Sequence, residues 1–274
     1  MSFKKSWVKI ILASVAGILM LTACGSANDS GSDSTSELPK IIIGCDKYPP
    51  YNFEDESGQP TGIDIDLARE SFARLGYEPE FVTINWEDKN ELLDSGEIDC
   101  IWSSYSIDGR EDKYNWTIPY LYSRQVVAVR EDSDIYTLAD LADRRLAVQS
   151  TTKPEDMFLD GTDPRLPKLR EIISLQDQEL IYPFLSKGYA DAIAAHEVVI
   201  AQNMSNYDLR YRILDEPLLT VGLGVAFSKN DERGINDRLS EVFMQMYDDG
   251  SFEEILGKYL EDPHKYLEVK PLES

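Results

Sequence analysis

The chain has 274 residues, with 50 acidic and 27 basic side chains, so its formal net charge is −23 at pH 7. A surface this acidic repels phosphate backbones, so we expect no nucleic-acid partner. The length is sufficient for one large domain or two medium-sized domains.

The N-terminal segment has the organisation of a bacterial lipoprotein signal peptide. Lys4, Lys5 and Lys9 precede or border an apolar run at 10–21, which is too short to span a bilayer comfortably. The run ends in Leu-Thr-Ala before Cys24, which looks like a lipobox. We therefore expect residues 1–23 to be removed and Cys24 to become an acylated N-terminus. The alternative is an ordinary membrane anchor with a chance cysteine.

Residues 24–38 are rich in glycine, serine and aspartate and contain nothing that could form a core. We expect this segment to be a flexible tether between the lipid and the folded part of the chain. Several acyl chains on one residue anchor a protein firmly, so the folded part would stay at the outer surface of the cell membrane.

After the tether, short apolar runs alternate with helical patterns. Strands are expected at 40–44, 81–84 and 98–103, and helices at 63–75 and 86–93 lie between them. This alternation is typical of a parallel sheet covered by helices, and it predicts the α/β fold class.

A second cycle of strands and helices follows. Further strands are expected at 125–129, 146–149, 192–195 and 221–227, and helices at 180–186, 235–247 and 252–259, with shorter helical starts at 137–141 and after 152. Cys45 and Cys100 both fall in strand-like segments. They are either two small buried apolar residues or, in an oxidising compartment, a disulfide pair.

Four blocks of sequence keep a fixed order between about residues 39 and 261. They are 46–51 with 58–67, then 93–100 with 106–110 and 118–120, then 138–141 with 148–152, and finally 188–192 with 249–251 and 258–259. As an ordered set they resemble the extracellular solute-binding proteins of polar-amino-acid ABC transporters, solute-binding protein family 3.

The resemblance implies the type II periplasmic binding protein fold, in which two α/β lobes, each a mainly parallel sheet flanked by helices, are joined by two crossing strands. The first lobe would comprise residues 39–128 and 222–274, and the second lobe residues 129–221. We expect the crossings at 126–130 and 220–225. The ligand would lie in the cleft between the lobes, where removal of water strengthens each polar contact.

The resemblance also implies a carboxylate-binding residue at Arg110, because a guanidinium can hold a carboxylate with two parallel hydrogen bonds. Without the resemblance, a surface ion pair would be the ordinary role. Ser104 and Ser106 would offer backbone or hydroxyl groups to the same anion, although this stretch is one residue shorter than the usual family pattern. Thr152 would either bind the anion at a helix N-terminus or simply cap that helix.

Four aromatic residues are further candidates for the cleft wall. Tyr48 and Phe81 match positions where family members pack aromatic rings on the ligand side chain, and Trp102 and Tyr105 lie near the carboxylate-binding block. Each could equally be an ordinary core residue, which is the commoner role of aromatics at strand ends.

The residue that would hold the ligand's α-amino group stays open. Family members often carry an aspartate after the Asp-Ala strand, and here His196 stands at that place with Glu197 next to it. Glu197 would replace the aspartate if the strand ended one residue later. If His196 is the replacement, the ligand need not be an ordinary α-amino acid.

The resemblance implies a monomer that binds an amino acid or a related carboxylate, without cofactor or metal, and delivers it to an ABC transporter permease. Two rival functions are an enzyme on the same fold, similar to cyclohexadienyl dehydratase, and a component that presents a ligand to a sensor. The chain has two histidines and shows no nucleophile elbow, phosphate loop or zinc-ligand spacing, so no catalytic residue is predicted.

Overall fold

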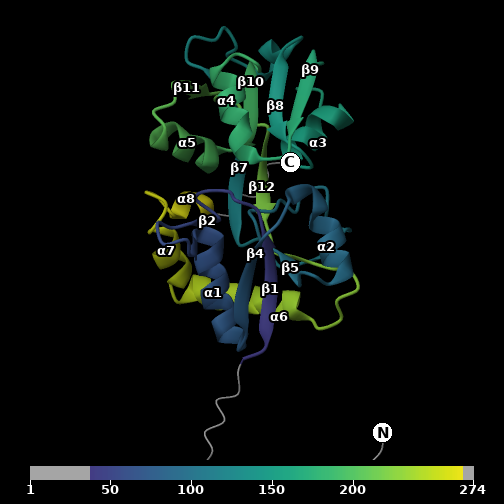
Figure 1. Cartoon of the computed structure of the whole chain (residues 1–274), viewed down its shortest axis with the longest axis vertical. Helices are drawn as coiled ribbons and strands as arrows, with labels where there is room; N and C mark the ends of the chain where they lie inside the picture. The colour runs from purple at the N-terminus through teal and green to yellow at the C-terminus, as the bar shows by residue number, and fades with distance from the viewer. Residues whose placement is uncertain (1–37, 268–274) are drawn as a thin grey trace, which may run out of the picture. The chain divides into compact units, whose positions relative to one another are not determined.

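The computed structural model describes residues 38–267, which form two α/β lobes built on separate sheets (Figure 1). The predicted signal peptide, the Cys24 lipidation site and all of the predicted tether except Leu38 lie outside the described residues. Within residues 38–267, no helix has both the length and the apolar character that crossing a membrane requires.

The first lobe is built on a five-stranded sheet in the order β4-β1-β5-β13-β6. β1 pairs in parallel with β4 and β5, whereas β13 runs antiparallel to β5 and β6. The strands are β1 Lys40–Cys45, β4 Glu78–Thr83, β5 Cys100–Ile101, β6 Asn115–Trp116 and β13 Ala226–Phe227, with a separate hairpin of β2 Phe53–Glu54 and β3 Pro60–Thr61. The helices are α1 Ile63–Leu75, α2 Lys89–Ser95, α6 Ile235–Asp248, α7 Ser251–Leu256 and α8 His264–Leu267.

The second lobe is built on a six-stranded sheet in the order β11-β7-β10-β8-β9, with β12 also paired to β7. β8 is parallel to β9 and β10, and β7 is antiparallel to its three partners. The strands are β7 Leu121–Arg130, β8 Arg145–Gln149, β9 Glu171–Leu175, β10 Ala192–His196, β11 Tyr211–Ile213 and β12 Leu219–Leu223. The helices are α3 Lys153–Asp160, α4 Ile181–Ser186 and α5 Glu197–Asn206.

The predicted α/β class with two lobes is therefore confirmed, and both sheets are mixed. In the first lobe the parallel pairs come from the strand-helix-strand units that the sequence indicated, and in the second lobe the pair of β8 with β10 joins two expected strands. The antiparallel pairs are added by strands that pass between the lobes or return from one, chiefly β7, β12 and β13.

Strand β7 contributes to the hydrophobic cores of both lobes. Leu121 packs in the core of the first lobe, whereas Val126 and Val127 pack on opposite faces of the second sheet. β12 pairs with the first half of β7, with Leu219 opposite Gln125 and Leu223 opposite Leu121. The two strands that connect the lobes are thus hydrogen-bonded to each other.

Some expected elements differ in the structure. The helical start at 137–141 is a single 3-10 turn, Leu138–Leu141, closed by a capping box between Thr137 and Asp140. The strand expected at 221–227 is interrupted at Gly224, where an added Cβ would lie 2.8 Å from Ile107. β9 and β11 were not expected from the pattern, because their partly exposed side chains lack a clear apolar period.

Helix α1 shows how the sequence pattern becomes packing. Ile63, Leu67 and Phe72 recur at helical spacing and are fully buried in the core of the first lobe. Gly76 ends the helix with a φ of 75°, a left-handed conformation that glycine adopts without strain.

Cys45 and Cys100 lie on neighbouring strands with buried, free thiols.

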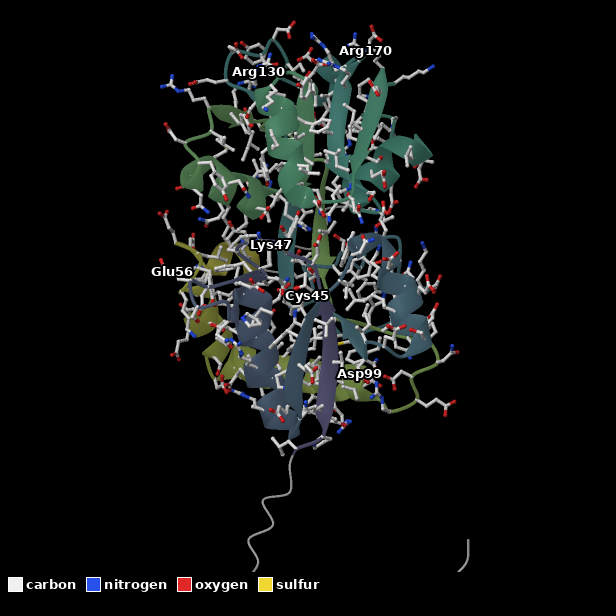
Figure 2. All side chains as sticks on the ribbon, in the orientation of Figure 1. Cys45, Lys47, Glu56, Asp99, Arg130 and Arg170 are labelled. Atoms are coloured by element: carbon white, nitrogen blue, oxygen red, sulfur yellow. The ribbon has the colours of Figure 1, made fainter. Side chains whose placement is uncertain are left out.

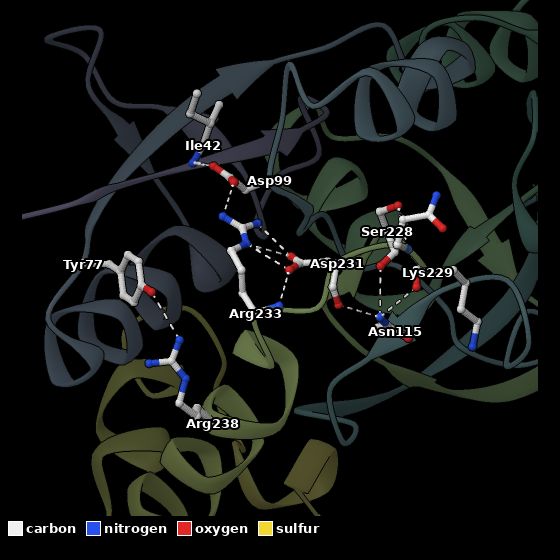
Figure 3. A network of polar contacts seen from close by, with 10 residues as sticks. Ile42, Tyr77, Asp99, Asn115, Ser228, Lys229, Asp231, Arg233 and Arg238 are labelled. Atoms are coloured by element: carbon white, nitrogen blue, oxygen red, sulfur yellow. Dashed lines mark hydrogen bonds and ion pairs between the residues drawn. The ribbon is translucent and has the colours of Figure 1, made fainter.

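A polar network fixes one end of the first sheet (Figure 3). The Asp99 carboxylate accepts the N–H of Ile42 at 2.7 Å and a guanidinium N–H of Arg233, also at 2.7 Å. Arg233 also pairs with Asp231, whose carbonyl accepts the side-chain amide of Asn115 at 3.2 Å. Elsewhere, exposed charged side chains such as Glu56 and Arg170 cover the outside of both lobes (Figure 2).

Candidate functional site

A cavity lies where the carboxyl ends of strands from both lobes meet. This is the edge at which α/β sheets usually bind ligands. Its wall consists of Asp46, Tyr48, Trp86, Ser103, Ser104, Tyr105, Ser106, Arg110, Gln125, Gln149, Thr151, Thr152, Lys153, Pro154, Gln178, Ala194, Ala195 and His196.

Arg110 is the most deeply buried cation in this wall, with 6% of its surface exposed. Its guanidinium lies over the ring of Tyr105, with 5.0 Å from Cζ to the ring centroid. Nη2 donates to Asp156 of α3 at 2.7 Å, and Nη1 donates to the carbonyl of Ser106 at 3.4 Å. The Tyr105 ring and the Asp156 carboxylate together restrict the orientation of this planar fork.

The loop that carries Arg110 is held by strand β12. The N–H of Ile107 donates to the carbonyl of Gly222 at 2.9 Å, and Gly222 donates back to the Asp108 carboxylate at 3.0 Å. Gly109 has a φ of 74°, which permits the tight turn just before the arginine. The position of Arg110 therefore depends on one of the two strands that connect the lobes.

Ser104 contributes to the wall in a different way from that expected. Its φ is 43°, and its backbone N–H donates to the buried Asp64 carboxylate at 2.6 Å, so this N–H is already occupied. Asp64 also accepts the Tyr120 hydroxyl at 2.8 Å, while burial raises its pKa to about 6. Ser106 forms an isolated antiparallel bridge with Leu223. Both serines lie in the cavity wall. Because the backbone N–H of Ser104 is occupied, this residue could donate to a ligand only through its hydroxyl.

Residues 149–152, which follow β8, carry most of the polar contacts from the second lobe to the first. Gln149 donates to the Asp46 carboxylate at 2.5 Å, and Ser150 donates to Glu87 at 2.6 Å. Thr151 has a left-handed φ of 57° and accepts a hydrogen bond from Lys89 at 2.8 Å. One short segment therefore meets three separate loops or helices of the opposite lobe.

Thr152 precedes α3, but its hydroxyl donates to the carbonyl of Gln149 at 2.6 Å and does not cap the helix. The capping alternative is thus not realised through the side chain. The first-turn position of Pro154 is compatible with helix entry, since proline lacks an N–H that would need a partner there.

Two charged groups close to the cavity have shifted pKa values. Lys89 is 2% exposed, and burial, followed by the nearby charge of Arg110, lowers its pKa to about 8. Its Nζ lies 4.7 Å from the centre of the Trp86 ring. Burial also raises the pKa of Asp46, the only acid among the described wall residues, above its ordinary value.

His196 lies at the end of β10, 5% exposed, directly opposite Gln125 of β7. The Gln125 amide nitrogen is 2.9 Å from Nε2 of the imidazole, and the Ser123 hydroxyl is 2.9 Å from Nδ1. The ring meets Tyr48 edge-on at 5.9 Å between centroids. Burial lowers the pKa of His196 to about 3, so the imidazole is neutral at physiological pH.

Seven of the ten predicted site residues thus lie together in one wall, namely Arg110, Ser104, Ser106, Thr152, Tyr48, Tyr105 and His196. Three lie elsewhere. Trp102 is 1% exposed and packs in the core of the first lobe against Phe72, Tyr120 and Phe243. Phe81 is on β4 beneath the Arg69 guanidinium, and Glu197 pairs with Arg124 at 3.1 Å.

The positions of these three residues outside the cavity wall have physical reasons. Trp102 directly follows β5 and its ring lies in the first-lobe core, and Phe81 packs against the same core from β4. β10 ends at His196 without the one-residue shift that would bring Glu197 inward. Sequence reasoning also missed Gln125, Gln149, Gln178 and Trp86. A buried polar residue in an apolar strand, as in the run at 125–129, is the signal that could have identified Gln125.

Comparison with known proteins gives the same assignment as the motifs. The family model for bacterial extracellular solute-binding proteins, family 3, matches residues 41–262. A histidine-binding periplasmic protein of Salmonella typhimurium is 32% identical over 86% of this chain and 93% of its own length. The glutamate-binding protein GluB of Corynebacterium efficiens is 27% identical over 99% of this chain and 97% of its own.

A solved structure, Tv2483 bound to L-arginine, superposes with a TM-score of 0.76 at 27% identity, covering 84% of this chain and 93% of that one. This similarity confirms the two-lobed type II periplasmic binding protein fold. These relatives are named for what they bind and not for a reaction. The chain therefore belongs to the bacterial extracellular solute-binding proteins, family 3, and is a binding protein rather than an enzyme.

Proposed function

We propose that this protein binds a free amino acid in the cavity between its lobes and delivers it to an ABC importer. The observation that carries the proposal is Arg110, a buried guanidinium stacked on Tyr105 in the cavity wall. A carboxylate is the ligand group that best matches such a fork. The names of the relatives, which include histidine- and glutamate-binding proteins, support an amino acid as its bearer.

The other wall residues would complete the site. The Ser104 hydroxyl would donate to the carboxylate, whereas the Ser106 carbonyl already accepts from Arg110 and the Thr152 hydroxyl already donates to Gln149. Tyr48 and Tyr105 would pack on apolar parts of the ligand, and the neutral His196 would border its nitrogen-bearing end. This division follows from charge, since Arg110 is the buried cation of the wall and His196 is neutral.

Calorimetric titration of the purified protein with each of the twenty protein L-amino acids tests the proposal. We expect one amino acid, or one chemically related group, to bind at micromolar or lower Kd, and the same compound to be found by mass spectrometry after denaturation of freshly purified protein. Absence of binding throughout the panel, with a folded protein, would refute the proposed ligand class.

We also propose that Cys24 is acylated after removal of residues 1–23, and that residues 24–38 tether the binding domain to the outer face of the cell membrane. This proposal is supported by the sequence alone, in which the lysines, the apolar run, the small residue and the cysteine follow one another in the order of a lipoprotein signal peptide. Replacement Cys24→Ser should release the protein into the medium or leave it unprocessed. A processed, membrane-bound mutant would contradict the idea.

Closure of the lobes about β7 and β12 is the motion we propose for uptake and release, with residues 39–128 and 222–274 moving against 129–221. Hinge closure is the usual response of two-lobed binding proteins. Small-angle scattering should give the mass of a monomer and a smaller radius of gyration in the presence of the bound amino acid. Identical curves with and without it would argue against closure.

A further inference from the structure

Gln125 has a buried carbonyl oxygen that lacks a partner. The residue is 2% exposed and lines the cavity, and its Oε1 has no hydrogen-bond donor within residues 38–267. Buried acceptors are almost always satisfied, since an unpaired one loses its hydration without compensation. Gln125 belongs to the cavity wall, so a donor for this oxygen would come from a group bound in the cavity.

The other end of the same amide is firmly held. Gln125 and His196 are cross-strand partners, and Nε2 of the amide is 2.9 Å from Nε2 of the imidazole. The ring is held in turn by the Ser123 hydroxyl at Nδ1 and by edge contact with Tyr48. Because the amide nitrogen faces the ring, the amide oxygen points away from it.

Both ring nitrogens of His196 are occupied by protein groups, so the imidazole has none left for a ligand. Asp46, the only acid among the described wall residues, already accepts Gln149 at 2.5 Å and the N–H of Lys47 at 2.8 Å. Gln125 Oε1 differs from these groups because it is buried and has no partner within residues 38–267.

We propose that Gln125 is a ligand-binding residue that accepts a hydrogen bond from an N–H group of the bound amino acid, with His196 as its positioning residue. This inference rests on the proposed function and adds to it the chemistry of the nitrogen subsite. Since the acceptor is an uncharged amide, the subsite selects a hydrogen-bond donor without requiring that it be a cation.

Calorimetric titration with the twenty protein L-amino acids tests the role on wild type, Gln125→Met and Gln125→Glu. The control Gln202→Met makes the same change on α5, where the side chain donates to Asn206 at 2.8 Å and is not part of the cavity wall. We expect Gln125→Met to weaken the amino acid that wild type binds by about tenfold. Gln125→Glu keeps an acceptor and should bind within about threefold of wild type or more tightly, and Gln202→Met should bind as wild type.

The positioning role of His196 has its own readout. His196→Phe should weaken binding in wild type but cause no further loss in the Gln125→Met background, because the two residues act through one hydrogen bond. An equal loss in both backgrounds would show that His196 acts independently and would overturn this part of the inference.

The remaining outcomes separate the two proposals. If wild type binds none of the amino acids, the proposed function fails and this inference fails with it. If wild type binds one and Gln125→Met binds it equally, only this inference is overturned. A larger loss in Gln125→Glu than in Gln125→Met would show that the ligand presents an acceptor there, which also overturns it. If Gln125→Met does not fold, the same comparison is made with Gln125→Leu, which also lacks the acceptor, and binding within about threefold of wild type then overturns the inference.

Discussion

The buried His196 should make the folded protein less stable in mild acid. Burial lowers its folded-state pKa from 6.5 to about 3, so between these values the unfolded chain binds a proton that the folded chain does not. Stability contributed by the neutral ring is complete above pH 6.5 and is lost as the pH falls below it. At 1.36 kcal/mol per pH unit, the loss between pH 6.5 and pH 5 is about 2 kcal/mol.

Urea unfolding followed by circular dichroism at pH 8, 7, 6 and 5 measures this effect as the difference between wild type and His196→Gln. Asp64 works in the opposite direction, because its pKa is raised to about 6 and its protonation stabilises the folded state as the pH falls. The difference between the two proteins removes that contribution.

We expect the stability difference between wild type and His196→Gln to change by about 2 kcal/mol from pH 8 to pH 5, with wild type losing more. His264→Gln, at the other histidine of the chain, is the matched control; its side chain is exposed and lies 3.1 Å from Glu253. A difference that stays constant over this range would refute a neutral, buried His196.

Three further predictions concern the site and the core. Arg110→Ala should weaken amino-acid binding, measured by calorimetry, at least about a hundredfold. Arg110→Lys should recover only part of the lost affinity, since an ammonium lacks the planar fork. A folded Arg110→Ala variant that binds within about threefold of wild type would contradict the proposed carboxylate-binding role. Trp102→Ala should cost about 3–5 kcal/mol in urea unfolding because the ring fills the first-lobe core, and a loss below about 1 kcal/mol would be inconsistent with that packing. Gly62→Ala should destabilise the protein by at least about 2 kcal/mol, as Gly62 has a φ of 125° and an added Cβ would lie 2.2 Å from the Tyr51 carbonyl; an unchanged melting temperature would contradict it.

Much of the fold follows from local pattern. The helix expected at 63–75 is α1, and the strand expected at 40–44 is β1 with one more residue, because apolar periodicity and a terminal glycine determine such elements locally. The short edge strand β9 could not be identified in this way. Its residues are half-exposed, and its stability comes from pairing with β8.

The sequence could predict those candidate site residues that belong to a local motif. It could not predict those that come together only through the pairing register of two strands. Arg110 and Thr152 belong to blocks of sequence whose spacing is local. The pairing of Gln125 with His196 joins residues 71 positions apart, and only the β7–β10 register brings them together. Glu197 shows the same limit, since a shift of one residue decides between the cavity and an ion pair with Arg124.

The continuity of β7 restricts where this chain can tolerate insertions. Alternate residues of a strand share a face, so Leu121, Ser123, Gln125 and Val127 point to one side. Because these residues share one face of β7, Leu121 lies in the first-lobe core, Gln125 in the cavity wall and Val127 in a core of the second lobe. One residue inserted after Ser123 would leave the first core intact while turning Gln125 and every later side chain of the strand to the opposite face. Single-residue insertions and deletions within β7 should therefore be eliminated by selection, whereas exposed loops such as the one containing Glu56 can vary in length.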